Sequence, residues 1–560
     1  MELQRAHKRQ RRSQSPASPP HQQQPAATFD PSRIWLPDIV QHFAASLTSN
    51  EVACALRLVN KATAAQFSAA QHTTVRLSQP VPHHAFVWRW AGPDAVRTLA
   101  RRQRLALPCL TVCSGSIANL EVLRARDELP PAPDCQVSWG AAAAAAGQLG
   151  VCVWLRKQGC TFQAGDALTA AARSGQQGVC EWLLANGCSE VANYLGAAAS
   201  AARGGHVGLM DWLLLRANRT DLAAVLAEAA EGCDLPTLQR LQHAHVDTLP
   251  GGLSAAWYKR VMLSAAAGSP TADWRAKVEW LEAQGCTQTA EACHVAAARP
   301  DALTRLQWLR QRGYPLDMFV AGDAAEAGNV EALQYVLSQG VGVRSGMMQR
   351  AAERGHVAVM EVLHARGVRM DEETVRAAAA GGHLPSVAWL VERLGAGATL
   401  TTYVFEAAAK AGSMELLRWL RAGGCPWDAT VFAAVAGYGS EEQLEWLLEQ
   451  GCCMGDDGEP YVRAACHGDL VMLRCLRRLG CPWRPDSITL AREVALMIYE
   501  LHGSGEPVQR MLSWLLDHGC PMDWDAVEVT AKDGDDEGLI GWLQAQRKQQ
   551  APVGSDVLRP

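Results

Sequence analysis

The sequence predicts an all-α solenoid of stacked helix pairs, and three recurring patterns indicate this fold class. A Trp-Leu register begins at Trp154 and ends at Trp542, and eleven of its thirteen steps are 27–30 residues, so the period is about 28. A fixed period of this kind is typical of stacked repeats. Each unit has a short Ala-rich half, followed by a half with larger apolar residues at helical spacing. A Gly closes most units, at the point where a helix end favours a left-handed residue.

The first segment, residues 1–32, is rich in Gln, Pro and Ser and carries the basic run KRQRR at residues 8–12. This composition buries too little apolar surface to order itself, so we expect a disordered tail. The basic run fits a nuclear localisation signal, but a solvated basic tail is the favoured interpretation because short basic runs are common.

Residues 33–75 are predicted to form a small helical unit, because Pro37 marks a helix start and Ile39, Val40, Phe43 and Leu47 continue an apolar face. The L-P start and the later run LRLVNK resemble the F-box pattern, although KATAAQF replaces the last helix that usually carries a Trp. The resemblance implies docking of a Skp-type adaptor through Leu36, Pro37, Ile39, Val40 and Phe43. The alternative is that the unit caps the solenoid, which needs a shield for its first face.

Residues 76–103 are expected to form connecting helices, residues 104–545 an array of about 14–15 units, and residues 546–560 a flexible tail. The runs AAERGHVAVMEVLHARGV and AARGGHVGLMDWLLLRA resemble the ankyrin pattern AA-x-x-GH-x-x-x-V-x-x-LL-x-x-GA. The T-P-L-H opening is missing and the period is nearer 28 than 33, which implies a shortened β-hairpin finger. The GC and GCPWD endings resemble divergent ankyrin arrays of protists and large viruses.

Three positions recur in the units. A polar residue at the turn between the two helices is of a type that mostly can cap the second helix: His206, Asn329, His356, His383, Ser413, Ser440 and Asp469. A Gly is expected to end that helix in the left-handed conformation: Gly159, Gly187, Gly285, Gly340, Gly367, Gly424, Gly451, Gly480 and Gly519. A Cys follows in the slot where the ankyrin pattern has Ala, as a small buried thiol: Cys160, Cys188, Cys286, Cys425, Cys452, Cys481 and Cys520.

Two insertions break the period, near residues 245–277 and 485–508, and insertions in repeat arrays often lie on the binding face. We therefore expect partner contacts from the array at Trp274, Trp427, Trp483 and Trp524, for which burial under the next unit is the alternative.

Nothing in the sequence predicts an enzyme or a cofactor site. The P-loop, H-E-x-x-H and G-x-S-x-G motifs are missing, and the eighteen cysteines include no C-x-x-C pair, so we expect no catalytic, cofactor or metal site. The net charge of −5 argues against a nucleic-acid partner. No apolar run is long enough to span a membrane.

The sequence thus favours a protein-interaction scaffold, cytoplasmic or nuclear, that serves as substrate receptor of a cullin-type ubiquitin ligase. Proteins, including a Skp-type adaptor and a cullin, are the expected partners. Two alternatives stay open: a scaffold with no ligase link, and a sphingomyelin or phospholipid phosphodiesterase, a label carried at family level by similar arrays.

Overall fold

The computed structural model describes residues 35–126, 133–160, 162, 165–187, 191–217, 222–245, 256–483, 505–520, 523–533 and 536–550. It divides the chain into two compact units, residues 1–75 and 76–560. The expected tail of residues 1–32, the last ten residues, Cys188 and most of the insertion at 485–508 lie outside the described residues.

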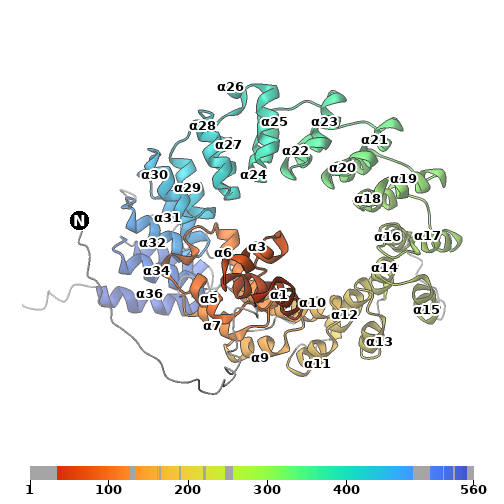
Figure 1. Ribbon diagram of the computed structural model, residues 1–560, viewed down its shortest axis with the longest axis horizontal. Helices are drawn as coiled ribbons and strands as arrows, with labels where there is room; N and C mark the ends of the chain where they lie inside the picture. Colours follow the sequence, from red (N-terminus) through yellow and green to blue (C-terminus); the bar gives the residue numbers. More distant parts are fainter. Residues whose placement is uncertain are drawn as a thin grey trace, which may run out of the picture. The chain divides into compact units, whose positions relative to one another are not determined.

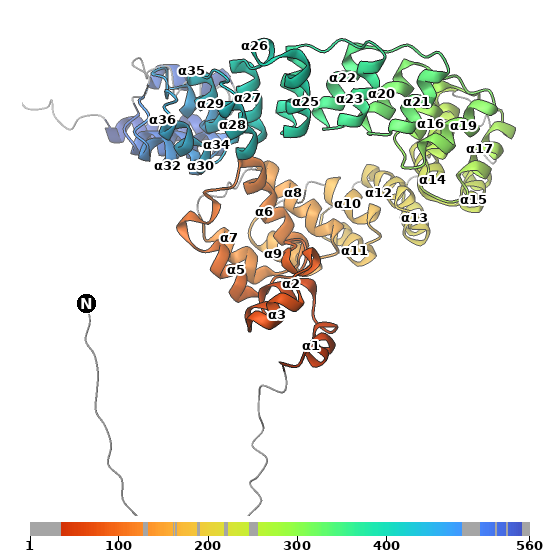
Figure 2. The ribbon, with the colours of Figure 1, turned by 45° about the horizontal axis from the view of Figure 1, so that its top comes forward.

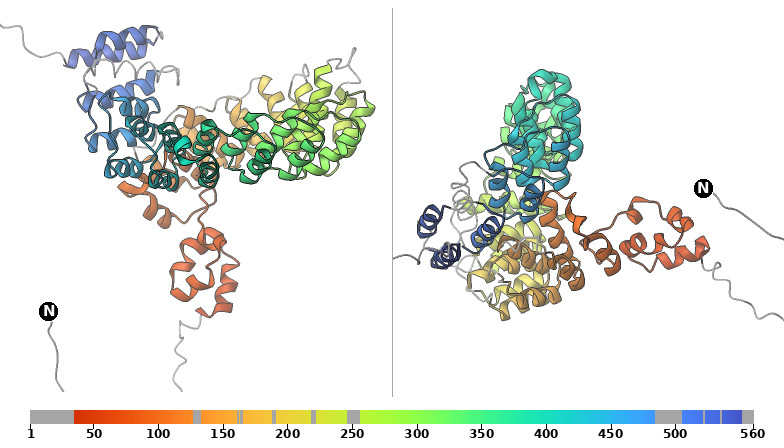
Figure 3. Two further views of the ribbon diagram at one scale, coloured as in Figure 1. Left: turned by 90° about the horizontal axis from the view of Figure 1, so that it is seen from above. Right: turned by 90° about the vertical axis from the view of Figure 1, so that its left-hand side faces the viewer.

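The amino-terminal unit is a cluster of short helices, seen in Figure 3. Its elements are α1 (Pro37–Ala44), α2 (Ser49–Cys54), the 3-10 turn η2 (Leu56–Leu58), α3 (Lys61–Gln66) and α4 (Ala70–Thr73). A small core of Val40, Ala44, Val52, Leu56 and Phe67 holds them together. Pro37 stands at the first position of α1, where its missing N–H costs no hydrogen bond.

The second unit begins with α5 (His83–Trp90) and the 3-10 turn η3 (Pro93–Val96) and continues as helix pairs. The first helices of the pairs are α6 (Arg101–Cys113), α8 (Pro133–Ala145), α10 (Asp166–Arg173), α12 (Val191–Arg203), α14 (Ala223–Gly232), α16 (Ala256–Ala267), α18 (Ala290–Ala297), α20 (Met318–Glu326), α22 (Ser345–Glu353), α24 (Glu372–Ala380), α27 (Thr402–Ala411), α29 (Ala429–Tyr438), α31 (Glu459–Cys466) and α35 (Trp524–Asp533).

The second helices follow the first ones along the chain, except that no described first helix directly precedes α34. They are α7 (Ile117–Arg124), α9 (Leu149–Lys157), α11 (Gln177–Ala185), α13 (Val207–Leu214), α15 (Leu235–His245), α17 (Trp274–Ala283), α19 (Ala302–Gln311), α21 (Val330–Ser338), α23 (Val357–Ala365), α25 (Leu384–Leu394), α28 (Met414–Ala422), α30 (Glu441–Glu449), α32 (Leu470–Arg478), α34 (Gly505–Asp517) and α36 (Glu537–Gln550). The short helix α26 (Ala396–Thr399) lies between α25 and α27.

The solenoid of helix pairs is built on two layers. Successive first helices contact one another directly, and from α10 to α25 they line the inner side of the curve, with the second helices outside (Figure 1). Figure 2 shows the pairs from α20 to α25 side by side. Most first helices carry a pair of fully buried Ala residues, such as Ala351 and Ala352, whose small side chains allow close helix approach. The predicted all-α solenoid is confirmed.

The Trp-Leu register is explained by the second helices. The Leu of each Trp-Leu pair, such as Leu309 or Leu390, is fully buried in the core. Where the preceding residue is Trp, it lies at the edge of the core. In three units an Arg four residues later covers its ring: Arg216 over Trp212 at 4.0 Å, Arg312 over Trp308 at 4.8 Å and Arg393 over Trp389 at 3.9 Å. Residues four apart on a helix are neighbours on its surface, which brings the guanidinium of these arginines over the Trp ring.

The connections between pairs are short loops. The expected β-hairpin finger is wrong for the described ranges, which contain no strand. With so few residues between pairs, as between Gly367 and Glu372, the chain passes directly from a helix end to the next helix start.

Candidate interaction surfaces

The amino-terminal unit exposes an apolar strip along α1. Ile39 and Phe43 are 40% and 47% exposed and lie four residues apart, so their side chains leave the same side of the helix. Leu36, 53% exposed, directly precedes the first turn of α1. Val40 turns to the core and is 1% exposed. Of the five residues named for adaptor docking, four, including Pro37, lie at the surface and Val40 does not.

Hydrogen bonds fix this strip in place within the unit. The Gln66 side chain on α3 donates to the carbonyl of Pro37 at 2.9 Å, which ties the start of α1 to α3. Thr48 and Glu51 form a capping box at α2, with the Thr48 amide 2.8 Å from the Glu51 carboxylate. These hydrogen bonds lower the pKa of Glu51. The exposed apolar side chains of α1 therefore project from a helix whose start is hydrogen-bonded to α3.

Three of the four tryptophans named as array contacts, Trp427, Trp483 and Trp524, are half-buried at joints between pairs. Trp427 packs edge-on against Phe405, with ring centroids 5.4 Å apart, and the Arg421 guanidinium lies 3.8 Å from its ring. Trp483 stacks on Tyr461 at 4.1 Å. Contacts within the array therefore bury part of the surface of these rings, and only the rest of that surface is open to a partner.

Trp274 lies in the core instead. It is 6% exposed, meets Trp308 edge-on at 5.1 Å and has the Arg305 guanidinium 4.5 Å from its ring. This side chain has almost no surface to offer a partner, because α17 begins at Trp274 and turns it inward.

The described end of the first insertion, residues 268–277, also serves packing. Lys277 is fully buried and its ammonium donates to the carbonyls of Ala230 and Cys233 at 2.7 and 2.8 Å and to the Ser269 hydroxyl at 2.7 Å. Burial lowers the pKa of Lys277 to about 8. This one buried amine thus joins α17 to the end of α14 and to the loop that carries Ser269.

The Gly-Cys ending of the units is a helix-ending motif. At α28 the amide of Cys425 donates to the carbonyl of Leu420, and that of Gly424 to the carbonyl of Arg421, both at 3.0 Å, which is the Schellman pattern. Gly424 has φ 78°, and all nine glycines predicted for this position have positive φ. The Cys425 thiol is buried and reaches the Thr401 carbonyl of the previous loop at 3.3 Å.

Burial makes the repeat-end thiols poor nucleophiles. It raises the pKa of Cys425, Cys452 and Cys481 to about 12, so the reactive thiolate is scarce at neutral pH. All described cysteines are free thiols, and Cys453 is the exposed one among them. The prediction of small buried thiols is confirmed for Cys286, Cys425, Cys452, Cys481 and Cys520, whereas Cys160 is half-buried.

The turn between the two helices joins successive units. The capping prediction holds for Ser413, Ser440 and Asp469, each of which accepts from a backbone amide of the following helix. It is wrong for His206, Asn329, His356 and His383, whose side chains make no capping hydrogen bond. His356 donates instead to the carbonyl of Glu326 in the previous unit at 3.0 Å.

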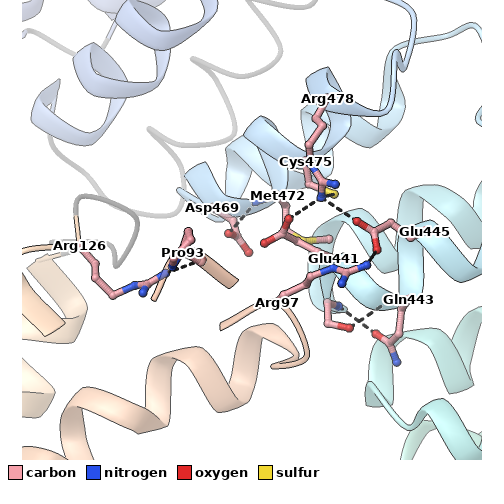
Figure 4. Close-up of polar contacts among 11 residues, drawn as sticks. Pro93, Arg97, Arg126, Glu441, Gln443, Glu445, Asp469, Met472, Cys475 and Arg478 are labelled. Atoms are coloured by element: carbon pink, nitrogen blue, oxygen red, sulfur yellow. Dashed lines mark hydrogen bonds and ion pairs between the residues drawn. The ribbon is translucent and has the colours of Figure 1, made fainter. Parts of the chain in front are cut away.

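A contact that no sequence pattern indicates joins the start of the second unit to its later repeats, and Figure 4 draws the part of it that Arg97 and Glu445 form. Arg104 on α6 pairs with Asp469 at the start of α32, and both side chains are buried, with 3% and 6% exposed. The Arg104 guanidinium also donates to the carbonyl of Gly439 at 3.1 Å. The same carbonyl accepts the amide of Arg101 at 3.1 Å. We call residues 97–104, with residues 439–445 and 469, the closure contact.

A partly exposed ion cluster lies at the edge of the closure contact and includes Arg478. Arg97 pairs with Glu445, and Arg478 reaches Glu441 and Glu445 at 2.7 and 2.8 Å. Burial alone would raise the pKa of Glu445, but the hydrogen bonds from Arg97 and Arg478 hold it below its ordinary value. The amide of Glu442 donates to the carbonyl of Arg97 at 3.2 Å. Backbone and side chains thus fasten the two segments together.

No group of three or more His, Cys, Asp or Glu side chains in the described ranges is arranged to hold a metal ion. Among the described helices, none combines the length and the apolar character needed to cross a membrane.

Comparison with known proteins gives matches to solved structures alone. No family model and no curated protein matches the chain. Matching structures include the pentatricopeptide repeat protein PPR10 in complex with an 18-nucleotide psaJ RNA element, at a TM-score of 0.26 and 11% identity over 92% of this chain and 97% of that one. A cysteine-to-serine variant of that complex matches at a TM-score of 0.25 and 11% identity over 92% of this chain and 97% of that one. PPR10 from maize matches at a TM-score of 0.21 and 12% identity over 80% of each chain.

The expected exclusion of nucleic acid is corrected. Two of the matching helical-repeat structures are complexes with RNA, so the exclusion is withdrawn. The physical reason is that a net charge of −5 sums over 560 residues and does not describe the charge of any one surface. At these TM-scores the similarity supplies no partner for this chain.

Proposed function

We propose that the chain is a protein-interaction scaffold whose amino-terminal unit docks a Skp-type adaptor of a cullin ubiquitin ligase. The observation that carries the proposal is the exposed apolar strip of α1, formed by Leu36, Ile39 and Phe43. Leu58 and Val59, at 76% and 48% exposed, add apolar surface in the same unit. Apolar side chains exposed this far at helical spacing are typical of a helix face that a partner covers.

The array supports the scaffold part of the proposal. Its helix pairs repeat a surface of variable side chains on an Ala-packed support, which is how solenoids bind partners. The free thiols of the described cysteines fit a reducing compartment, so we place this function in the cytoplasm or nucleus.

The test is capture of a recombinant Skp-type adaptor and cullin by the full-length chain. The double variant Ile39→Asp with Phe43→Asp is expected to weaken adaptor binding at least ten-fold. Its two carboxylates would have to give up their hydration to enter an apolar interface. Both residues are exposed, so the variant should keep the melting temperature of the wild type.

Val529→Asp is the matched control, since Val529 is 52% exposed on α35, far along the chain from α1. It should leave adaptor capture unchanged. If the wild-type chain fails to capture the adaptor, the ligase link is wrong and a scaffold without it remains.

A further inference from the structure

A hollow of about 530 Å³ opens between the first helices α20 and α22. Met318, Phe319 and Met347 give it apolar walls, and Gly322 and Gly346 form part of its lining. A Cβ built on either glycine would meet nothing within 4 Å, so packing does not require glycine there. Phe319 is 56% exposed at its rim.

The register of the repeats marks Gly322 as unusual. Ten other first helices carry a side chain at this position, two residues before the buried Ala pair or its equivalent: Thr169, Ala199, Ala227, Ser264, His294, Gln349, Arg376, Glu406, Ala433 and Val462. Glycine inside a helix costs about 1 kcal/mol relative to alanine. Gly322 destabilises its helix and no neighbouring atom requires a glycine there, which indicates that the open space beside it has a binding role.

The rim of this hollow is positively charged. Arg344 and Arg350 both line it. Arg350 and Arg354 share one partner, Glu326, at 3.3 and 3.0 Å. Arg344 is exposed and has no ion-pair partner among the described residues. The rim can therefore accept an anionic group beside an apolar one.

A second hollow of about 480 Å³, two repeats further along, has the opposite charge. Asp371, Glu372 and Glu373 line it with Arg376 and with Tyr403, whose side chain is 68% exposed. Tyr403 occupies the same register position on α27 as Phe319 on α20. Both hollows thus combine an exposed aromatic ring with charge, and the charges differ in sign.

We propose that these two hollows bind one extended peptide of a partner protein, with an acidic and an apolar residue at α20–α22 and a basic residue at α24–α27. The site deepens the proposed scaffold function, on which it rests, by naming the chemistry of its target. Packed helices lie 8–10 Å apart, so two steps span about 20 Å. An extended chain advances about 3.3 Å per residue, which places the basic residue about six positions away.

The mixed charge favours a peptide over RNA. An RNA strand carries a negative phosphate at every nucleotide, and the carboxylates of Asp371, Glu372 and Glu373 would repel it at the second hollow. A peptide can alternate its charges to match both hollows.

The experiment is fluorescence anisotropy of the full-length chain with labelled 12-residue Gly/Ser peptides. Each peptide carries a Glu-Leu pair and a Lys three, six or nine residues away, and a charge-swapped peptide has Lys-Leu and Glu at the same places. We expect the six-residue spacing to bind most tightly, at least ten-fold more tightly than its charge-swapped form.

Two variants test the first hollow. Gly322→Leu fills it and Arg350→Glu replaces one of its two positive charges by a negative one, and each should weaken binding of the six-spaced peptide at least ten-fold. Gly322→Ala should raise the melting temperature and weaken peptide binding, two shifts in opposite directions that a purely structural role would not produce. Gly196→Ala on α12 is the matched control, since it also replaces a helix glycine but should leave binding unchanged.

Equal binding of the charge-swapped peptide, no binding of any peptide, or unchanged binding by Gly322→Leu overturns the proposal. So does a single-stranded 12-nucleotide RNA that binds in place of the peptides and is released by Arg350→Glu. Adaptor capture is measured on the same protein: if capture persists while peptides fail, the peptide site alone is wrong, and if peptides bind while capture fails, the ligase link is wrong.

Discussion

At the scale of single residues, the repeat-end cysteines act as small apolar side chains. Cys425 is fully buried, and its thiol lies close to a carbonyl of the previous loop rather than facing solvent. Burial disfavours the thiolate that a nucleophile or a metal ligand needs, so Cys425 in the Cys-Pro-Trp run of residues 425–427 serves packing.

The raised thiol pKa values predict a loss of stability in alkali. An unfolded thiol loses its proton near pH 9, whereas Cys425 keeps its proton until about pH 12 in the folded state. The unfolded state therefore binds fewer protons above pH 9, and the free energy of unfolding falls as pH rises, by roughly 1 kcal/mol per buried thiol at pH 10. Urea titrations at pH 8 and pH 10 measure this fall.

Cys425→Ala should reduce that fall by roughly 1 kcal/mol, since one titrating group is removed. Cys453→Ala, at the exposed cysteine, should leave it unchanged. An equal fall in the Cys425→Ala variant and the wild type would show that burial of this thiol does not set the pH dependence.

At the scale of elements, the turn between paired helices is coupled to the turn of the next unit. Gly328 has φ 76°, and a Cβ on it would lie 2.7 Å from the ring of His356 in the following unit. The glycine is thus required twice, by its own backbone conformation and by the ring that covers it.

A double-mutant cycle separates these two requirements. Gly328→Ala should destabilise the array by about 1–3 kcal/mol through strain and overlap with the ring. In a His356→Ala background the overlap is removed, so the same change should cost measurably less. Urea denaturation of the four proteins gives the coupling energy, and a coupling of zero would mean that the ring does not restrict Gly328.

Local requirements could be predicted from the sequence, and contacts between units could not. The nine helix-ending glycines were predicted because the left-handed conformation is a demand of one residue, and their φ values lie between 75° and 111°. The role of His356 was missed because its partner, the Glu326 carbonyl, belongs to another unit. The burial of Trp274 was missed for the same reason.

At the scale of the whole second unit, the closure contact is an exception to the one-dimensional character of a solenoid, in which each repeat contacts only its neighbours. Arg104 and Asp469 are 365 residues apart in sequence. The sequence could not predict this pair, because it depends on the summed rotation of every repeat between them.

Arg104→Met should open the closure contact, because it leaves the Asp469 carboxylate buried without its charged partner, at a cost of about 3–5 kcal/mol. Hydrogen exchange should then speed up at the amides of Arg101 and Glu442, which donate across the contact. Amides of α20–α25 should keep their wild-type rates.

Arg97→Ala is the control for this experiment. Its ion pair with Glu445 is partly exposed, so it should change stability by less than about 1 kcal/mol. Unchanged exchange at Arg101 and Glu442 in the Arg104→Met variant would show that the buried pair does not hold the contact.

The closure contact also constrains how this gene product can evolve. Open repeat arrays gain and lose units by duplication and deletion, because each new unit needs only a neighbour on either side. Here an added or lost unit between α8 and α29 would shift Asp469 and Gly439 by a whole repeat and rotation relative to Arg104. The closure contact therefore requires a constant number of units between its two ends. We expect homologues that keep the contact to differ by substitution rather than by the number of repeats.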